Sequence, residues 1–169
     1  MKHIILRGKL ARSMNLEAIV DDEDYEMLSK HKWHAVKSIT KSNGTLSTFY
    51  AASQNMTLMH RMILRITDRK KIVDHKNRNG LDNQKHNLRE CTHSQNLGNA
   101  KLHITNTSGF RGVYKTKSGK WMAAISSGTH SIKRLGLFNT KEEAAVAYDM
   151  AATEKYGEFA SLNFKKPAP

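Results

Sequence analysis

Four polar residues that could share one chemical task lie close together in the chain: Asp74, His75, Asn87 and Asn96. They belong to the stretch 73–99, in which Asn and His stand where a segment of this length would need apolar residues for a core. Carboxylate, imidazole and amide groups at positions that would otherwise be apolar and buried are more typical of a functional site than of a structural segment. We therefore expect this stretch to be a site, and the chemistry that suits it is metal-dependent cutting of DNA.

The charge of the chain indicates a polyanionic partner. The formal net charge is +13 and the pI is near 9.9, with 8 basic and 6 acidic residues in 1–59, 10 and 4 in 60–108, and 10 and 5 in 109–169. Each phosphate that Lys or Arg neutralises releases counterions, which favours nucleic acid. Charge alone would fit ribosomal proteins and anionic membranes equally well. The single cysteine, Cys91, excludes a disulfide framework and fits a reducing cytoplasm.

The stretch is predicted to fold as strand, loop, strand and helix. Ile72–His75 is expected to end a strand, 76–83 to form a loop rich in Asn and Gly, and Leu88–Thr92 to form a second strand. Thr92 with Gln95 forms a capping box, which predicts a helix that carries Asn96.

A further helix is expected just before the site. Leu58–Ile66 has apolar residues at helical spacing and should pack behind the site. Its His60 is expected to be structural, with contact to DNA or to the active site as the alternative.

This order, with these residues, resembles the HNH (His-Me finger) nucleases. The residues that carry the resemblance are Asp74-His75, Asp82-Asn83, Asn87-Leu88-Arg89 and Ser94-Gln95-Asn96. The resemblance implies a ββα-metal core in which His75 is the general base and Asp74 and Asn96 hold a single Mg²⁺ or Mn²⁺ ion. It implies also that Asn87 pins the loop and orients His75. Asn96 stands where many members have a histidine.

The chemistry required to cut a phosphodiester suits these groups. It needs a nucleophilic hydroxide, help for the leaving 3′ oxygen and neutralisation of charge on the phosphate. A histidine with a pKa near ~6.5 can take a proton from water at cellular pH. A hard divalent cation on oxygen ligands can supply the rest.

Other functions remain open from the sequence. One is a DNA-binding regulator whose nuclease fold is silent, and another is a protein that binds or cuts RNA. A zinc site built from His86, Cys91 and His93 lacks a clear fourth ligand.

Residues 1–59 are predicted to form a small β-rich module. Strands are expected at His3–Leu6 and Leu16–Val20, and Asp21 is expected to cap a helical turn over Asp22–Leu28. Trp33–Ile39 and Leu46–Ala52 flank Asn43-Gly44, which indicates a hairpin. The aromatic residues Tyr25, Trp33 and Tyr50 are expected to be core residues, and no chemistry is expected in this module.

Residues 109–164 indicate three strands followed by one helix. The strands are expected at Val113–Lys117, Trp121–Ser126 and Ser131–Phe138. Thr140 and Glu143 form a capping box for a helix over Lys141–Tyr156, whose alanine-rich face should lie close against the sheet.

This region resembles the AP2/ERF DNA-binding domain. The matching pieces are Arg111-Gly112-Val113, Gly119-Lys120-Trp121, Leu135-Gly136 with Phe138, Glu142–Asp149 and Leu162-Asn163-Phe164. In that family the sheet lies in the major groove, which implies DNA contacts from Arg111, Lys115, Lys117, Lys120, Trp121, Lys133 and Arg134. Sheet packing is the alternative for Trp121. Tyr114, Thr116 and Ser118 replace arginines and a tryptophan of the plant members, so sequence preference does not carry over.

We therefore expect an α+β protein with a β-rich module (1–59), an HNH core (60–99), a linker (100–108) and an AP2-like domain (109–165). A three-stranded antiparallel sheet packed on one helix is expected in the last. Phage-type HNH endonucleases often carry such a domain, so a homing-type enzyme acting on double-stranded DNA in the cytoplasm of a bacterial host is expected. No protein partner is expected, and neither a signal peptide nor a membrane span is indicated.

Overall fold

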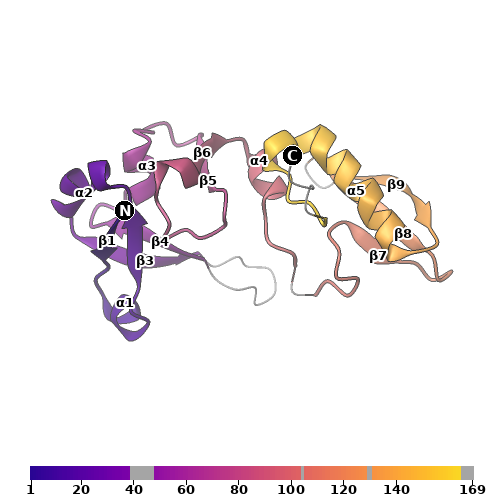
Figure 1. The fold of residues 1–169 in the computed structure, drawn as a ribbon, viewed down its shortest axis with the longest axis horizontal. Coiled ribbons are helices and arrows are strands. Elements are labelled where there is room, and N and C mark those ends of the chain that lie inside the picture. Colours follow the sequence, from indigo (N-terminus) through magenta and orange to yellow (C-terminus); the bar gives the residue numbers. More distant parts are fainter. Residues whose placement is uncertain (39–47, 104, 129–130, 165–169) are drawn as a thin grey trace. The chain divides into compact units, whose positions relative to one another are not determined.

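The computed structural model describes residues 1–38, 48–103, 105–128 and 131–164 (Figure 1). The chain divides into two compact units, Met1–Thr92 and His93–Pro169, each of which combines helices with small antiparallel β-structure, so the predicted α+β class is confirmed. The first unit contains β1 (Lys2–Ile5), α1 (Lys9–Ser13), β2 (Glu17–Val20), α2 (Asp22–Ser29), β3 (Trp33–Ser38), β4 (Thr48–Ser53), α3 (Met59–Ile63), β5 (Ile72–His75), the 3-10 turn η1 (Lys85–Asn87) and β6 (Leu88–Cys91). The second contains α4 (His93–Gly98), β7 (Val113–Lys115), β8 (Trp121–Gly128), β9 (Ser131–Phe138), α5 (Lys141–Tyr156) and the 3-10 turn η2 (Gly157–Phe159).

Three strand pairs build the first unit: β1 with β2, β3 with β4, and β5 with β6. Leu6, Leu28, Trp33 and Met59 lie at its centre and are at most 2% exposed. The indole nitrogen of Trp33 donates to the carbonyl of Leu28 at 2.8 Å and so joins β3 to α2. The core position predicted for Trp33 is confirmed, whereas the predicted Asn43-Gly44 turn lies outside the described residues.

The helix predicted over 58–66 is shorter in the structure. It begins at Met59 and ends at Ile63, and Arg65 adopts a φ of +54°. A residue in this left-handed conformation cannot continue an α-helix. The short α3 places His60 and Ile63 in the interior of the unit.

The N-terminal strands hold the far end of the 76–83 loop. Ile19 on β2 donates its N–H to the carbonyl of Leu81 and accepts from the N–H of Asn83, both at 2.8 Å. The carboxylate of Asp21 accepts from the side chain of Gln84 at 3.1 Å and from the N–H of Lys85 at 2.8 Å. Asp21 stands at the predicted N-cap position of α2, but its side chain makes no capping hydrogen bond to the helix. Its oxygens are turned to the loop instead.

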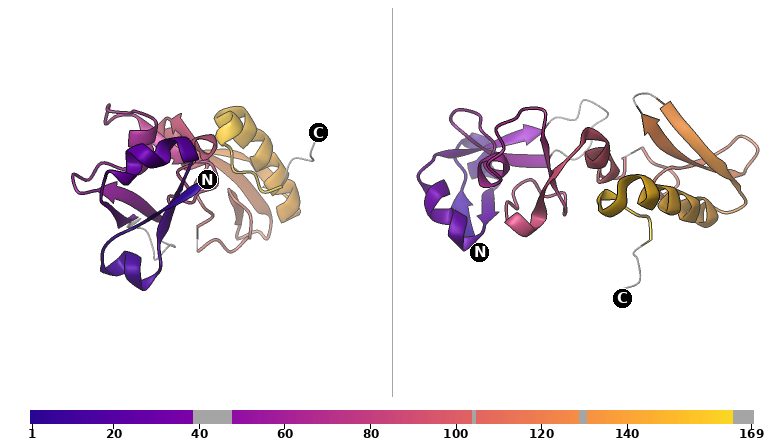
Figure 2. Two further views of the ribbon diagram at one scale, coloured as in Figure 1. Left: turned by 60° about the vertical axis from the view of Figure 1, so that its left-hand side comes forward. Right: turned by 90° about the horizontal axis from the view of Figure 1, so that it is seen from above.

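A three-stranded sheet with α5 along one face forms most of the second unit (Figure 2). The strands follow the order β7-β8-β9, and both pairs are antiparallel. Val113 and Ala123 on the sheet pack with Ala144 and Ala145 on the helix, and each is at most 1% exposed. Small side chains on both surfaces therefore let the helix lie close to the sheet.

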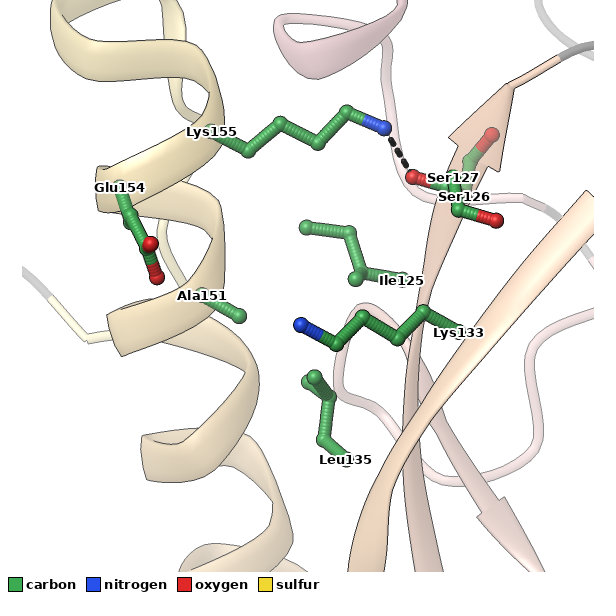
Figure 3. A pocket seen from close by; sticks show the side chains of 8 residues that line it. All are labelled: Ile125, Ser126, Ser127, Lys133, Leu135, Ala151, Glu154 and Lys155. Carbon is green, nitrogen blue, oxygen red and sulfur yellow. Dashed lines mark hydrogen bonds between the residues drawn. The ribbon is translucent and has the colours of Figure 1, made fainter.

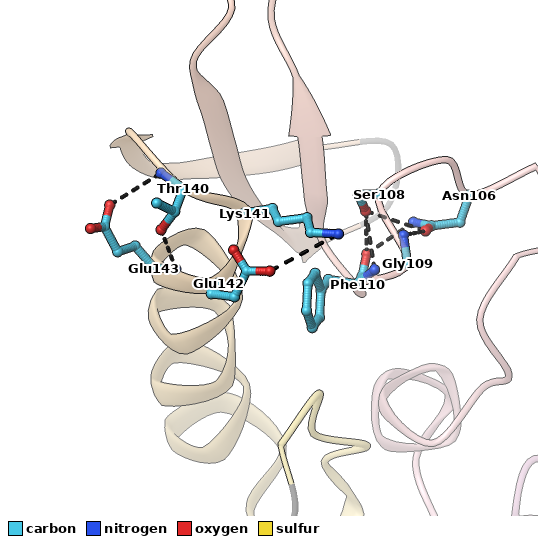
Figure 4. A network of polar contacts seen from close by, with 8 residues as sticks. All are labelled: Asn106, Ser108, Gly109, Phe110, Thr140, Lys141, Glu142 and Glu143. Carbon is cyan, nitrogen blue, oxygen red and sulfur yellow. Dashed lines mark hydrogen bonds and ion pairs between the residues drawn. The ribbon is translucent and has the colours of Figure 1, made fainter.

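The start of α5 is fixed by the predicted capping box (Figure 4). The hydroxyl of Thr140 accepts from the N–H of Glu143 at 3.2 Å, and the carboxylate of Glu143 accepts from the N–H of Thr140 at 3.3 Å. The capping box prediction is confirmed.

A hydrogen-bonded turn precedes β7 in the same view (Figure 4). Asn106 accepts from the N–H of Gly109 at 2.7 Å, and its amide donates to the carbonyl of Phe110 at 2.9 Å. The ammonium of Lys141 lies 5.6 Å from the centre of the Phe110 ring. The turn is thereby joined to the first residue of α5.

Candidate functional site

Asp74 and His75 end strand β5, and both are buried, with 5% of each residue exposed. In the register of the strand pair, Asp74 lies opposite Arg89 and His75 opposite Leu88. Arg89 donates to Oδ2 of Asp74 from Nε at 2.9 Å and from Nη2 at 2.8 Å. The guanidinium therefore orients this carboxylate and offsets its charge inside the protein.

The imidazole of His75 is held by a second buried amide. Its Nε2 lies 3.4 Å from Oδ1 of Asn83, a residue that is 0% exposed. The Asn83 amide nitrogen donates to the carbonyl of Leu81 at 3.1 Å, and this bond turns Oδ1 toward the ring. An acceptor at Nε2 favours the tautomer with the proton on Nε2, in which Nδ1 is the basic nitrogen.

Two further rings pack against His75. The ring of His60 on α3 is 5.1 Å from it in an edge-to-face arrangement, and the ring of Tyr50 on β4 is 5.7 Å from it. Tyr50 and His60 also contact each other, at 5.8 Å. The structure confirms that His60 is a buried residue of the interior, and it adds that His60 contacts the candidate base.

Burial controls the protonation of this ring cluster. It lowers the pKa of His60 to about 3, with smaller contributions from His75 and Arg61. Burial also lowers the pKa of His75, although the hydrogen bond to Oδ1 of Asn83 and the charges of nearby Asp74 and Asp82 act in the opposite direction. Both imidazoles are therefore neutral at pH 7, and burial raises the pKa of Tyr50, so this phenol stays protonated.

Asn87, on η1, is bonded to the 76–83 loop at three points. Its Oδ1 accepts from the N–H of Asn77 at 3.0 Å, and its amide nitrogen donates to Oδ1 of Asn77 at 3.1 Å and to the carbonyl of Asp82 at 2.8 Å. Asn87 is 3% exposed, so these bonds replace the water that its amide would otherwise bind. The loop that follows His75 is thereby closed onto the start of β6.

The loop also approaches strand β4 closely at Gly80. A Cβ atom at this position would lie 2.4 Å from the carbonyl oxygen of Phe49 and 2.6 Å from the ring of Tyr50. Any larger residue would therefore displace the loop or the ring that contacts His75. The β-rich module, in which no chemistry was expected, supplies one wall of the candidate site.

Asn96 lies on α4 in the second unit and is half-buried. Its predicted sharing of an ion with Asp74 stays a prediction. Among the described residues, no group of three or more His, Cys, Asp or Glu side chains could hold a metal ion, and this includes the set His86, Cys91 and His93. Burial raises the pKa of Cys91 to about 11, which keeps the thiol protonated at pH 7.

The residues predicted to bind DNA do not share one face of the sheet. Lys133 pairs with the buried Ile125, and its side chain points toward α5 together with that of Leu135, whereas Lys155 reaches from α5 toward the sheet (Figure 3). Arg134, the next residue, points to the opposite face. Trp121 packs against the core on the α5 side.

The other candidate residues have different surroundings. The Lys115 ammonium lies 5.7 Å from the centre of the Trp121 ring. Lys117 and Lys120 are exposed at the turn between β7 and β8, and Arg111 reaches the carbonyl of Ala100. DNA contacts by all seven residues stay predictions.

From the sequence, neither Tyr50 nor Asn83 was expected to have a catalytic or binding role. Asn83 belongs to the motif that carried the nuclease resemblance, so its position could have drawn attention to it. Nothing in the sequence connects Tyr50 with His75, because the two residues meet only through the packing of β4 against β5 and the loop.

In the part of the chain that the structure describes, no helix has the length and apolar character needed to cross a membrane.

No family model matches the chain. Two kinds of known protein are similar to it, one over most of its length and the other over part of it. It is 32% identical over 163 residues to the uncharacterized HNH endonuclease L560 of Acanthamoeba polyphaga mimivirus, a match that covers 91% of this chain and 78% of that protein. Over 65 residues it is 45% identical to ethylene-responsive transcription factor ERF070 of Arabidopsis thaliana, which covers 35% of this chain and 40% of that protein. Dehydration-responsive element-binding protein 2E of the same plant is 45% identical over 64 residues, or 32% of this chain and 26% of its own length.

Proposed function

Because this chain belongs to the HNH endonuclease family and also contains an AP2/ERF-like segment, we propose that it hydrolyses phosphodiester bonds in double-stranded DNA with one bound divalent ion. The observation that carries the proposal is the buried, neutral imidazole of His75. It lies on the same strand as Asp74, β5, and is hydrogen-bonded to Asn83. The strand pair β5–β6 and helix α4 would form its ββα-metal core.

His75 is the general base in this proposal. Since burial lowers its pKa, the ring is neutral at pH 7 and can accept a proton without first losing one. With Oδ1 of Asn83 as the acceptor at Nε2, Nδ1 would be the nitrogen that takes the proton from the attacking water. Asn87 is a positioning residue that holds the backbone of the loop directly after His75.

Asp74 and Asn96 would hold the ion. A carboxylate and an amide oxygen are the hard oxygen ligands that Mg²⁺ and Mn²⁺ take. When bound, the ion would neutralise charge on the phosphate and on the leaving 3′ oxygen. Because Arg89 offsets the charge of Asp74, we expect the protein alone to bind the ion weakly and the DNA phosphates to complete its ligands.

DNA binding is assigned to the second unit. The segment that contains the AP2/ERF motifs, from Arg111 to Phe164, is similar in length to the AP2/ERF matches. We propose the same domain boundaries that the sequence indicated. A homing role stays a prediction from family analogy.

Plasmid cleavage with Mg²⁺, with and without EDTA, tests the proposal. His75→Ala should lower the cleavage rate at least about a hundredfold, as expected for the loss of a general base, yet retain binding of the plasmid. His86→Ala is the matched control, because His86 is an exposed histidine in the same segment. A wild-type chain that binds plasmid and cuts neither strand would be a regulator instead.

A further inference from the structure

The three-stranded sheet of the second unit has two different faces. Val113 lies opposite Ala123, and Ile125 opposite Lys133; these residues belong to the α5 side. Neighbouring residues of a strand point to opposite faces, so the residues between them form the other face. We call this other face the outer face; its large side chains are Tyr114, Met122, Ile132, Arg134 and Leu137.

The outer face is apolar and accessible. Tyr114 is 51% exposed, Ile132 67% and Leu137 58%. Tyr114 and Leu137 flank the central Met122 in register, so the apolar side chains run across all three strands. Among these five residues only Arg134 is charged. An exposed apolar surface of this kind marks a binding surface more often than a solvated one.

The charges of the second unit favour an anionic partner on the sheet. The chain has no acidic residue between Glu90 and Glu142, so the strands and their turns carry only positive charge. All acidic residues of this unit lie on α5 or after it: Glu142, Glu143, Asp149, Glu154 and Glu158. A partner that binds the outer face should therefore carry negative charge at its edges and present apolar groups at its centre.

We propose that the outer face recognises A·T-rich duplex DNA by packing Tyr114, Ile132 and Leu137 against thymine methyl groups in the major groove. The proposal rests on the DNA binding proposed above and adds which base pairs are preferred. Three strands about 4.8 Å apart span roughly 10 Å, which suits a major groove about 12 Å wide. The thymine methyl is the apolar group that a base pair presents there, whereas guanine is read mainly by Arg or Lys.

Removing the methyl groups from the DNA tests the proposal without changing the protein. The full chain is titrated in EDTA with alternating poly(dA-dT), with poly(dA-dU), which lacks the methyl groups, and with poly(dG-dC). Binding to poly(dA-dU) should be about fourfold weaker for each methyl group that the face contacts, the ratio expected for burying one such group. Equal affinity for poly(dA-dT) and poly(dA-dU), or a preference for poly(dG-dC), would overturn it.

Variants then connect the methyl effect with the outer face. Ile132→Ser combined with Leu137→Ser should reduce the difference between poly(dA-dT) and poly(dA-dU) to the contribution of Tyr114, about fourfold or less. Met150→Ser is the matched control, since Met150 is 70% exposed on α5, and it should leave the difference unchanged. A methyl effect of undiminished size after the double substitution would refute the assignment to this face.

Two other outcomes have separate meanings. No binding to any of the polymers would count against the proposed DNA binding itself, and the inference would fall with it. Self-association of the wild-type chain in sedimentation, abolished by the double substitution, would identify the outer face as a contact between copies and overturn the inference.

Discussion

Replacing Arg89 by methionine should strongly destabilise the first unit. Arg89 and Asp74 form an ion pair at 2.8 Å in which the side chains are only 12% and 6% exposed. Arg89→Met keeps much of the apolar volume but leaves the Asp74 carboxylate buried without its cation. Breaking a buried pair in this way costs about 3–5 kcal/mol of the free energy of unfolding. With a urea m value of roughly 1.5 kcal/mol/M, the unfolding midpoint should fall by about 2–3 M.

Urea unfolding followed by tryptophan fluorescence measures this loss. Trp33 is buried in the first unit, and Trp121→Phe in every variant removes the signal of the second. Lys71→Met is the matched control, because Lys71, directly before β5, pairs with Glu90 on β6 at 2.9 Å while both side chains are about half exposed, at 49% and 47%. An exposed pair of this kind contributes less than about 1 kcal/mol.

A double substitution separates the charge effect from loss of packing. Asp74→Asn combined with Arg89→Met removes both charges, and it should recover more than about 2 kcal/mol of the loss. The reasoning is refuted when Arg89→Met costs no more than Lys71→Met. It is refuted as well when the neutral double variant is no more stable than Arg89→Met alone.

Three further predictions follow from the site and the fold. Asn83→Leu should lower the cleavage rate by at least about tenfold with little change in DNA affinity, since the ring of His75 loses the partner that fixes its tautomer; a shift in affinity alone would contradict this. Between pH 3 and 6.5 the unfolded chain binds a proton at His60 that the folded chain does not, so the free energy of unfolding should fall as pH decreases, by about 1.6 kcal/mol from pH 6.5 to 5. Urea titrations at both pH values measure this slope, which His60→Met should reduce. Thr140→Ala removes half of the capping box and should cost about 1 kcal/mol in a Trp121-detected unfolding curve, and an unchanged curve would show that the cap is not needed.

Local patterns were sufficient for much of the fold. The period-two and helical spacings predicted β5, β6, β8, β9 and α5, because each element depends on residues adjacent in the sequence. The capping box of Thr140 and Glu143 formed as expected for the same reason. Asp21 did not cap α2, because its oxygens bond to Gln84 and Lys85, which are distant in the sequence.

The sequence by itself determined which groups could do chemistry: a carboxylate, a histidine and amides at the spacing of an HNH nuclease, on a chain whose positive charge suits DNA. Only the tertiary structure decided how two of them are held. The pairing of β5 with β6 brings Arg89 onto Asp74, and the packing of β4, α3 and the loop encloses His75 with Tyr50, His60 and Asn83. The physical reason is that burial and long-range hydrogen bonds set the orientation and protonation of a side chain, and neither is a property of its neighbours in the sequence.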